Sequence, residues 1–222
     1  MAKADRILCL RCKGETNHIV RGEFERSWNT DESAGRSRHQ IVECAGCNTV
    51  SYRSVTDGPD YYNSNTGEME SEVDLYPRRH ANSRLAKNFW NAPEKLRTLY
   101  REVIDAYNAD MPVLCAGGLR ALVEGIALDK GISGGDLPKN PNNPSAETVC
   151  RDSLQGKIAG MAQKSLLSPS HADALNEHRF LGNEALHELK KPSAESLEAA
   201  IDVIEHTMEN VYELQEKRRR IR

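Results

Sequence analysis

The sequence lacks any long apolar run and carries almost no net charge. Lys plus Arg (30) nearly balance Asp plus Glu (33), which leaves a formal charge of −3. A near-neutral chain is not a generic binder of polyanions, so any contact with nucleic acid must come from a local patch. A membrane-spanning helix needs about 20 consecutive apolar residues, so we expect no membrane segment. The opening "MAKADRILCL" has no signal-peptide core, which predicts a cytoplasmic protein.

The first part of the chain has the character of a β module. Short segments such as "QIVEC", "TVSYRSV" and "HIVRGEFERSW" are rich in β-branched and aromatic residues, and turn residues separate them. The segment "SEVDLYP" ends this part at Pro77. We therefore predict a small β module over residues 1–76, followed by a linker over 77–92.

From Pro93 the apolar residues recur with helical spacing. We predict one helix beginning there and further helices at about 112–130, 147–167, 170–190 and 193–218. The segment "GISGGDLPKNPNNPSAE" between the second and third helices is expected to be a loop, because glycine, proline and asparagine dominate it. The predicted fold class is α+β, in which the β module precedes an antiparallel bundle of four to five helices over 93–222.

Four of the six cysteines form two C-x-x-C pairs, Cys9 with Cys12 and Cys44 with Cys47. Two such pairs separated by a β-rich segment have the spacing of a zinc ribbon, in which four thiolates surround one Zn²⁺. Disulfides are the alternative, but a cytoplasmic protein would not keep them. A redox C-x-x-C would stand singly in a βαβ setting. We therefore predict a structural zinc site, whose closed ligand shell leaves no position for catalysis.

The other two cysteines, Cys115 and Cys150, fall in predicted helices. Single thiols in such places act most often as small apolar residues of the core. Aromatic residues of the first part, such as Phe24 and Tyr52, are expected to pack around a zinc core or to stack on bases.

A polar stripe interrupts the fourth predicted helix. Arg179, Asn183 and His187 follow one another at intervals of four residues, so they lie along one gently winding line. Arg120 and Glu124 form an i,i+4 pair on the otherwise apolar second helix. These five polar residues could be a structural network that sets the helix register. They could equally form a site in which a histidine, a cation and a carboxylate act on a phosphodiester.

Four segments carry a family resemblance: "LYREVIDAYNADMPVLCAGGLRALVEGIALDKGI", "LQGKIAGM", "RFLGNEALHEL" and "AIDVIEHTMENVYE". Over about residues 90–215 the chain resembles the bacterial family known as domain of unknown function 4145. That family is similar to the HEPN superfamily (higher eukaryotes and prokaryotes nucleotide-binding). The resemblance implies a helical bundle that forms a homodimer, preceded by a zinc ribbon, in a phage-defence or toxin–antitoxin setting.

Many HEPN proteins are metal-independent endoribonucleases that use an arginine, a polar residue and a histidine. The resemblance implies that His187 assists attack of the ribose 2′-hydroxyl, Arg179 stabilises the phosphorane and Asn183 orients the phosphate. The residue before Asn183 is Gly182, where the family pattern has arginine. Two hypotheses follow: a ribonuclease whose zinc ribbon selects RNA or a partner, or a non-catalytic dimeric module with a structural zinc.

Overall fold

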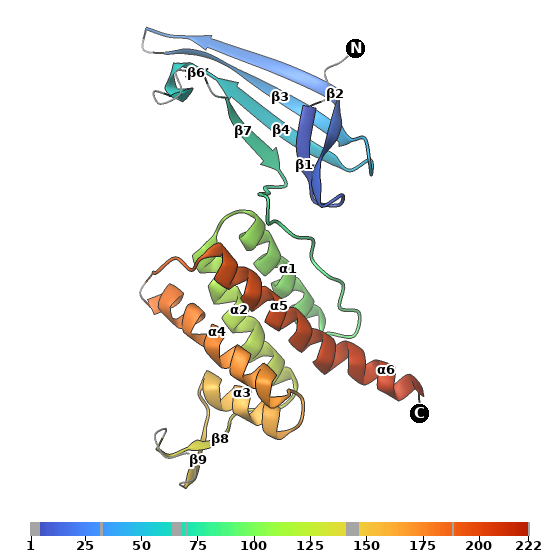
Figure 1. The fold of residues 1–222 in the computed structure, drawn as a ribbon, viewed down its shortest axis with the longest axis vertical. Coiled ribbons are helices and arrows are strands. Elements are labelled where there is room, and N and C mark those ends of the chain that lie inside the picture. Colours follow the sequence, from blue (N-terminus) through green and yellow to red (C-terminus); the bar gives the residue numbers. More distant parts are fainter. Residues whose placement is uncertain are drawn as a thin grey trace. The chain divides into compact units, whose positions relative to one another are not determined.

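The computed structural model describes residues 5–31, 33–63, 68–69, 71–140, 147–187 and 189–221. Within these ranges the side chains at 5, 60, 62–63, 68–69, 178–184, 186–187 and 218–221 are not described. The chain divides into two compact units, Met1–Leu85 and Ala86–Arg222. Figure 1 shows the first as a β-sheet and the second as helical. The fold is therefore α+β, and the predicted linker at 77–92 spans the division between the units.

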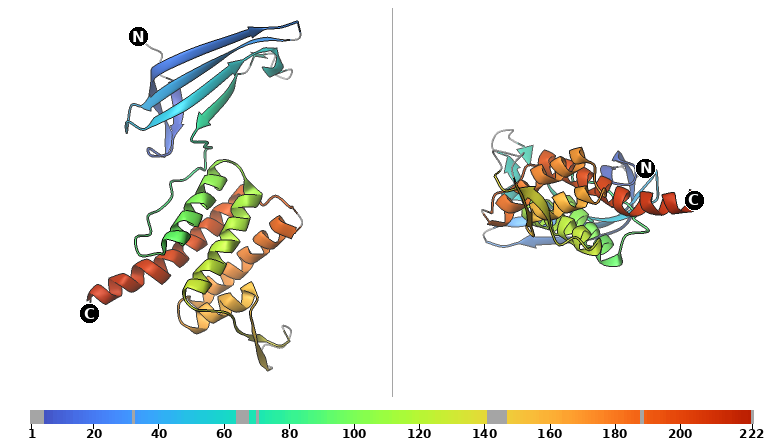
Figure 2. Two further views of the ribbon diagram at one scale, coloured as in Figure 1. Left: turned by 180° about the vertical axis from the view of Figure 1, so that it is seen from behind. Right: turned by 90° about the horizontal axis from the view of Figure 1, so that it is seen from below.

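The first unit is built on one antiparallel sheet that curls in Figures 1 and 2. In spatial order its strands are β1 (Asp5–Cys9), β2 (Gly14–Asn29), β3 (Ala34–Cys44), β4 (Val50–Asp57) and β7 (Glu72–Tyr76). Between β4 and β7 lie a short 3₁₀ helix η1 (Pro59–Tyr61) and the two-stranded ribbon of β5 (Tyr62–Asn63) and β6 (Glu68–Met69). The strands predicted around the second cysteine pair are confirmed.

The sheet has an inner and an outer face because successive side chains of a strand point to opposite sides. The buried side chains of the sheet lie on the inner face and include Ile7, Val42 and Val55. It also holds a polar row in which the Gln40 amide donates to Glu23 and accepts from the Arg53 guanidinium. The outer face is exposed to solvent along much of β2 and partly buried along much of β3.

The second unit is a helical bundle. Its helices are α1 (Glu94–Asn108), α2 (Pro112–Asp129), α3 (Leu154–Gln163), α4 (Pro169–His187), α5 (Ala194–Met208) and α6 (Leu214–Ile221). One π-helical turn, η2 (Glu209–Glu213), joins α5 to α6, so the helix predicted at 193–218 is α5, η2 and α6 together. Figure 2 shows α6 extending past the other helices. Among the described residues no helix is both long and apolar enough to cross a membrane.

Helix α2 is the central element of the bundle and contacts α1, α3, α4 and α5. This position explains its composition, since a helix surrounded by others is apolar on nearly all sides. Leu122 and Ile126 of α2 are fully buried, and so is its thiol Cys115. Two glycines allow α1 to lie close: a Cβ on Gly118 would come within 2.5 Å of Val103, and one on Gly125 within 2.7 Å of Leu96.

The expectation of a loop over 131–147 and a helix from 147 is wrong. The structure has a hairpin here, in which β8 (Gly135–Pro138) pairs with β9 (Thr148–Arg151), and α3 begins only at Leu154. Cys150, expected in a helix core, is therefore an exposed strand residue. A Cβ on Gly156 would overlap the backbone of Arg151, and one on Gly160 that of Gly134. The hairpin thus lies directly on α3, which glycine alone permits.

Candidate metal centre and polar sites

The four paired cysteines meet at one place in the first unit. Their Sγ atoms all lie within 4.8 Å of one another. Cys9 and Cys47 are 3.5 Å apart and Cys12 and Cys44 are 3.8 Å apart, each measured between Sγ atoms. A disulfide requires about 2.05 Å. A tetrahedron with metal–sulfur bonds of about 2.3 Å has edges of about 3.8 Å. The spacing therefore fits four thiolates around one metal ion.

Two matching turns bring the thiols together. One connects β1 to β2 and the other connects β3 to β4. In each, the residue after the second cysteine has a left-handed backbone, Lys13 with φ 56° and Asn48 with φ 59°. In the second turn the Gly46 amide donates to Cys44 Sγ at 3.4 Å, and a Cβ on this residue would make a tight contact of 3.3 Å with Cys12 Sγ. Tight turns of this kind let backbone amides face the sulfur atoms.

The pKa values of the four thiols are shifted in opposite directions, raised for Cys9 and Cys12 and lowered for Cys44 and Cys47. Burial raises the pKa of Cys44, but hydrogen bonds from the Thr16 hydroxyl and the Gly46 amide outweigh it and lower that pKa to about 6. Hydrogen bonding to the sulfurs of Cys47 and Cys44 raises the pKa of Cys12 to about 12. Some thiols of the cluster are therefore stabilised as thiolates, whereas ionisation of the others is disfavoured. This is expected where like charges lie close together. A bound cation would favour ionisation of these thiols, since thiolates are the form that ligates metal.

The sequence prediction did not include three residues that lie around the cluster. The hydroxyls of Thr16 and Thr49 lie 3.1 Å from the sulfurs of Cys44 and Cys47. Arg79 donates from Nε to the carbonyl of Leu8 at 2.7 Å, beside the first cysteine pair. A divalent ion with four thiolates would carry a net charge of −2, which a nearby guanidinium offsets. A threonine follows each cysteine pair within four residues, so its position near the cluster could be predicted from the sequence. Arg79 is distant in sequence from both pairs and could not.

The polar stripe of the fourth helix lies only partly within the described residues. Helix α4 includes positions 179, 183 and 187, so the predicted spacing along one helix holds for the backbone. The side chains of Arg179, Asn183 and His187 lie outside the described residues.

The predicted pair on α2 is present and has a third member. Arg120 Nη2 lies 3.4 Å from Glu124 Oε1, and Lys157 Nζ of α3 lies 3.7 Å from Glu124 Oε2. These three side chains are about one quarter to two fifths exposed. The Glu124 carboxylate lies between two cations and so links α2 to α3. The contribution of such ion pairs to stability is small.

A more deeply buried charged group lies elsewhere in the bundle. The Glu205 side chain is 1% exposed, and its carboxylate accepts from the Tyr100 hydroxyl at 2.7 Å. Lys87 Nζ lies 2.9 Å from the other oxygen of Glu205, and the Lys87 amide donates to the Tyr100 hydroxyl at 3.0 Å. Hydrogen bonding to Glu205 raises the pKa of Lys87. The network ties the segment before α1 to α5.

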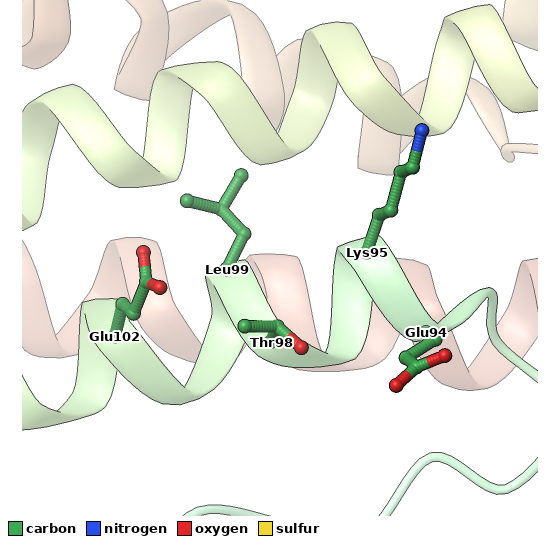
Figure 3. A pocket seen from close by; sticks show the side chains of 5 residues that line it. All are labelled: Glu94, Lys95, Thr98, Leu99 and Glu102. Atoms are coloured by element: carbon green, nitrogen blue, oxygen red, sulfur yellow. The ribbon is translucent and has the colours of Figure 1, made fainter.

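A shallow hollow of about 400 Å³ lies along α1. Its lining residues all come from that helix and are shown in Figure 3: Glu94, Lys95, Thr98, Leu99 and Glu102. Leu99 and Lys95 point to one side of the helix and Glu94 to the other, so these groups do not converge. The hollow therefore has none of the convergent polar groups typical of a small-molecule site.

Comparison with known families assigns the helical part. Residues 101–222 match the family described as Domain of unknown function (DUF4145). The chain belongs to this family. The DUF4145 match begins within α1 and includes the rest of the helical unit, whereas the four-cysteine cluster precedes it. No curated protein and no solved structure matches the chain.

Proposed function

We propose that the protein is an RNA-binding protein in which a zinc ribbon precedes an HEPN-like helical domain. The observation that carries the proposal is the closed cluster of four thiols. Four sulfur ligands complete the tetrahedron that Zn²⁺ prefers and leave no position for water or substrate. A metal ion held by four thiolates stabilises the sheet, which we expect to act as a binding surface and not as a site of metal-centred chemistry. Membership of the DUF4145 family, which resembles HEPN proteins, supports RNA as the ligand and a homodimer in bacterial defence or toxin–antitoxin action.

Metal analysis tests the zinc ribbon. We expect about one equivalent of zinc in the purified protein. Cys44→Ser removes a ligand and should lose the metal, whereas Cys150→Ser alters an exposed thiol outside the cluster and should keep it. Full metal content in the Cys44 variant would overturn the assignment of the ligands. Another metal in place of zinc would leave the ligand set but change its occupant.

A second candidate function is metal-independent cleavage of RNA by His187. It is favoured by the continuous helix α4, which carries positions 179, 183 and 187 at intervals of one turn. If the site is active, His187 is the proton acceptor for the ribose hydroxyl. If it is not, the domain binds RNA or a partner protein without cleaving it.

Mixed RNA incubated with native protein, His187→Ala and His206→Ala separates these functions. His206 is an exposed histidine of α5 and is the matched control. Cleavage lost only in the His187 variant supports the ribonuclease. Equal cleavage by all three proteins removes it and leaves binding, measured by fluorescence anisotropy, as the function. Light scattering tests the dimer, and a strictly monomeric protein would count against a site shared between two subunits.

A further inference from the structure

Four ring side chains form one row across the outer face of the sheet. Phe24 of β2 stands opposite His39 of β3, and Tyr52 of β4 stands opposite Tyr76 of β7. His39 and Tyr52 are diagonal neighbours on adjacent strands, because His39 pairs with Ser54. These strands are side by side in Figure 1. We call Phe24, His39, Tyr52 and Tyr76 the aromatic row.

The rings of the row are spaced evenly and two neighbouring pairs are nearly parallel. Successive centroids lie 6.2, 6.1 and 5.7 Å apart, with interplanar angles of 20°, 12° and 52°. His39 Nδ1 lies 2.6 Å from the Tyr52 hydroxyl. A phenol oxygen lies in the plane of its ring, so these two rings meet edge to edge and form a continuous surface. The row therefore presents ring faces in sequence rather than one closed stack.

The rings do not pack into a core. Phe24 is 65% exposed, Tyr76 43% and Tyr52 38%, whereas the buried side chains of the same strands lie on the inner face. Cross-strand ring pairs stabilise a sheet whether or not a ligand binds. The row alone therefore does not identify a ligand, and the charges around it supply the second observation.

An exposed arginine lies at each end of the row. Arg78 places its guanidinium carbon 5.8 Å from the centroid of the Tyr76 ring. Arg26 follows Phe24 by two residues on β2 and so shares its face, and no carboxylate among the described residues lies within 4.0 Å of it. The carboxylates of Asp74 and Glu72 lie along β7 on the same face. These two carboxylates would repel a polyanion that lay along β7. A bound polyanion must therefore run across the strands.

The spacing favours an extended single strand. Neighbouring rings are 5.7 to 6.2 Å apart, well above the rise of roughly 3.4 Å per nucleotide in a stacked duplex strand. Bases separated by this distance do not stack on one another, and each can stack on a protein ring. Sheet faces that carry exposed rings bind single-stranded RNA in this manner.

We propose that the outer face of the sheet binds single-stranded RNA, with bases stacked along the aromatic row and phosphates held by Arg26 and Arg78. The choice of RNA rests on the proposed function, whereas the place of binding rests on the rings and arginines. The inference does not depend on any reaction at α4. Nor does it depend on contact with the zinc, which stabilises the strands but does not touch the ligand.

Fluorescence anisotropy on the full-length protein tests the proposal, with a single-stranded RNA of about 10 nucleotides as the probe. Phe24→Leu and Tyr76→Leu keep apolar bulk but remove a ring, and each should weaken binding about 5- to 150-fold. Trp90→Leu removes an exposed aromatic ring from the helical unit and should leave the affinity unchanged. Zinc content and circular dichroism of each variant establish that the sheet is folded.

The arginines and the ligand class are tested in the same assay. Arg26→Gln and Arg78→Gln should each lower the slope of log affinity against log salt by roughly 0.7 for a single strand. Single-stranded DNA and duplex RNA are the comparison probes, and both should bind more weakly than the single-stranded RNA. Ultraviolet cross-linking to the RNA should label peptides of β2, β4 or β7.

The outcomes separate this inference from the proposed function. If the native protein and the ring variants bind RNA with equal affinity, RNA does not bind along the aromatic row and must bind elsewhere on the chain. Absence of RNA binding by the native protein overturns both. Preference for single-stranded DNA overturns the choice of RNA. Loss of the dimer in the ring variants shows that a second copy covers the face, which also overturns the inference.

Discussion

The buried hydroxyl of Tyr100 should contribute more to stability than any other single hydroxyl considered above. It donates to the carboxylate of Glu205 at 2.7 Å and accepts from the amide of Lys87 at 3.0 Å. Tyr100 is 1% exposed, so water cannot replace either hydrogen bond without local opening. Tyr100→Phe removes only this oxygen and keeps the ring that packs edge-on against Phe89. The substitution therefore isolates the hydrogen bonds.

The expected loss follows from the two partners. A hydrogen bond to a charged group contributes about 1.5–3 kcal/mol, and one to a neutral amide about 0.5–1.5 kcal/mol. Tyr100→Phe should therefore lower the free energy of unfolding by about 2–4 kcal/mol. For a helical unit of this size that corresponds to a fall in Tm of about 6–15 °C. The assay is thermal and urea denaturation followed by the helical circular dichroism signal.

Tyr212→Phe is the matched control. Its hydroxyl also donates to a carboxylate, that of Asp129 at 2.9 Å, but Asp129 is 30% exposed and has Lys130 at 3.1 Å. Water and lysine can compensate there, so the expected loss is about 1 kcal/mol. A loss below about 0.5 kcal/mol in the Tyr100 variant, or one no larger than in the control, would refute the reasoning from burial.

Three further substitutions test local features. A hydrogen bond from Ser71, together with Arg36 and Arg38, lowers the pKa of Asp57, so Asp57→Asn should cost stability at neutral pH. That difference should vanish as pH falls below 4 through the folded-state value; a constant difference in acid denaturation would contradict it. Gly160→Ala should destabilise by about 1–3 kcal/mol in urea, since a Cβ would meet the hairpin, and a gain would contradict the packing. Ser193→Ala removes the N-cap bond to the Ser196 amide and should cost about 1 kcal/mol in the same assay.

The cysteine site shows what local sequence can predict. Each C-x-x-C turn is a short-range structure, and its two thiols are positioned by a few backbone angles. The spacing alone therefore predicts that Cys9, Cys12, Cys44 and Cys47 lie together, and the structure brings their sulfur atoms within 4.8 Å of one another. Tetrahedral thiolate sites bind either zinc or iron.

The hairpin of β8 and β9 shows where local sequence misleads. Glycine, proline and asparagine predict a loop over 131–147, and the segment that follows is expected to be a helix. The glycines of α3 instead leave space for a strand backbone to lie on the helix. A short strand is stabilised by its partner and by the surface beneath it, neither of which is encoded next to it in the chain.

The α+β class, the pairing of four cysteines in two C-x-x-C turns and the approximate positions of the main helices can be predicted from the amino-acid sequence alone. These features depend on hydrophobic periodicity and on turn residues, which act over a few neighbouring positions. The tertiary structure was needed to find two other features, the exposed aromatic row and the buried network of Tyr100, Glu205 and Lys87. Strand register and helix packing join residues from distant segments, and the free energy that selects those pairings belongs to the folded chain as a whole.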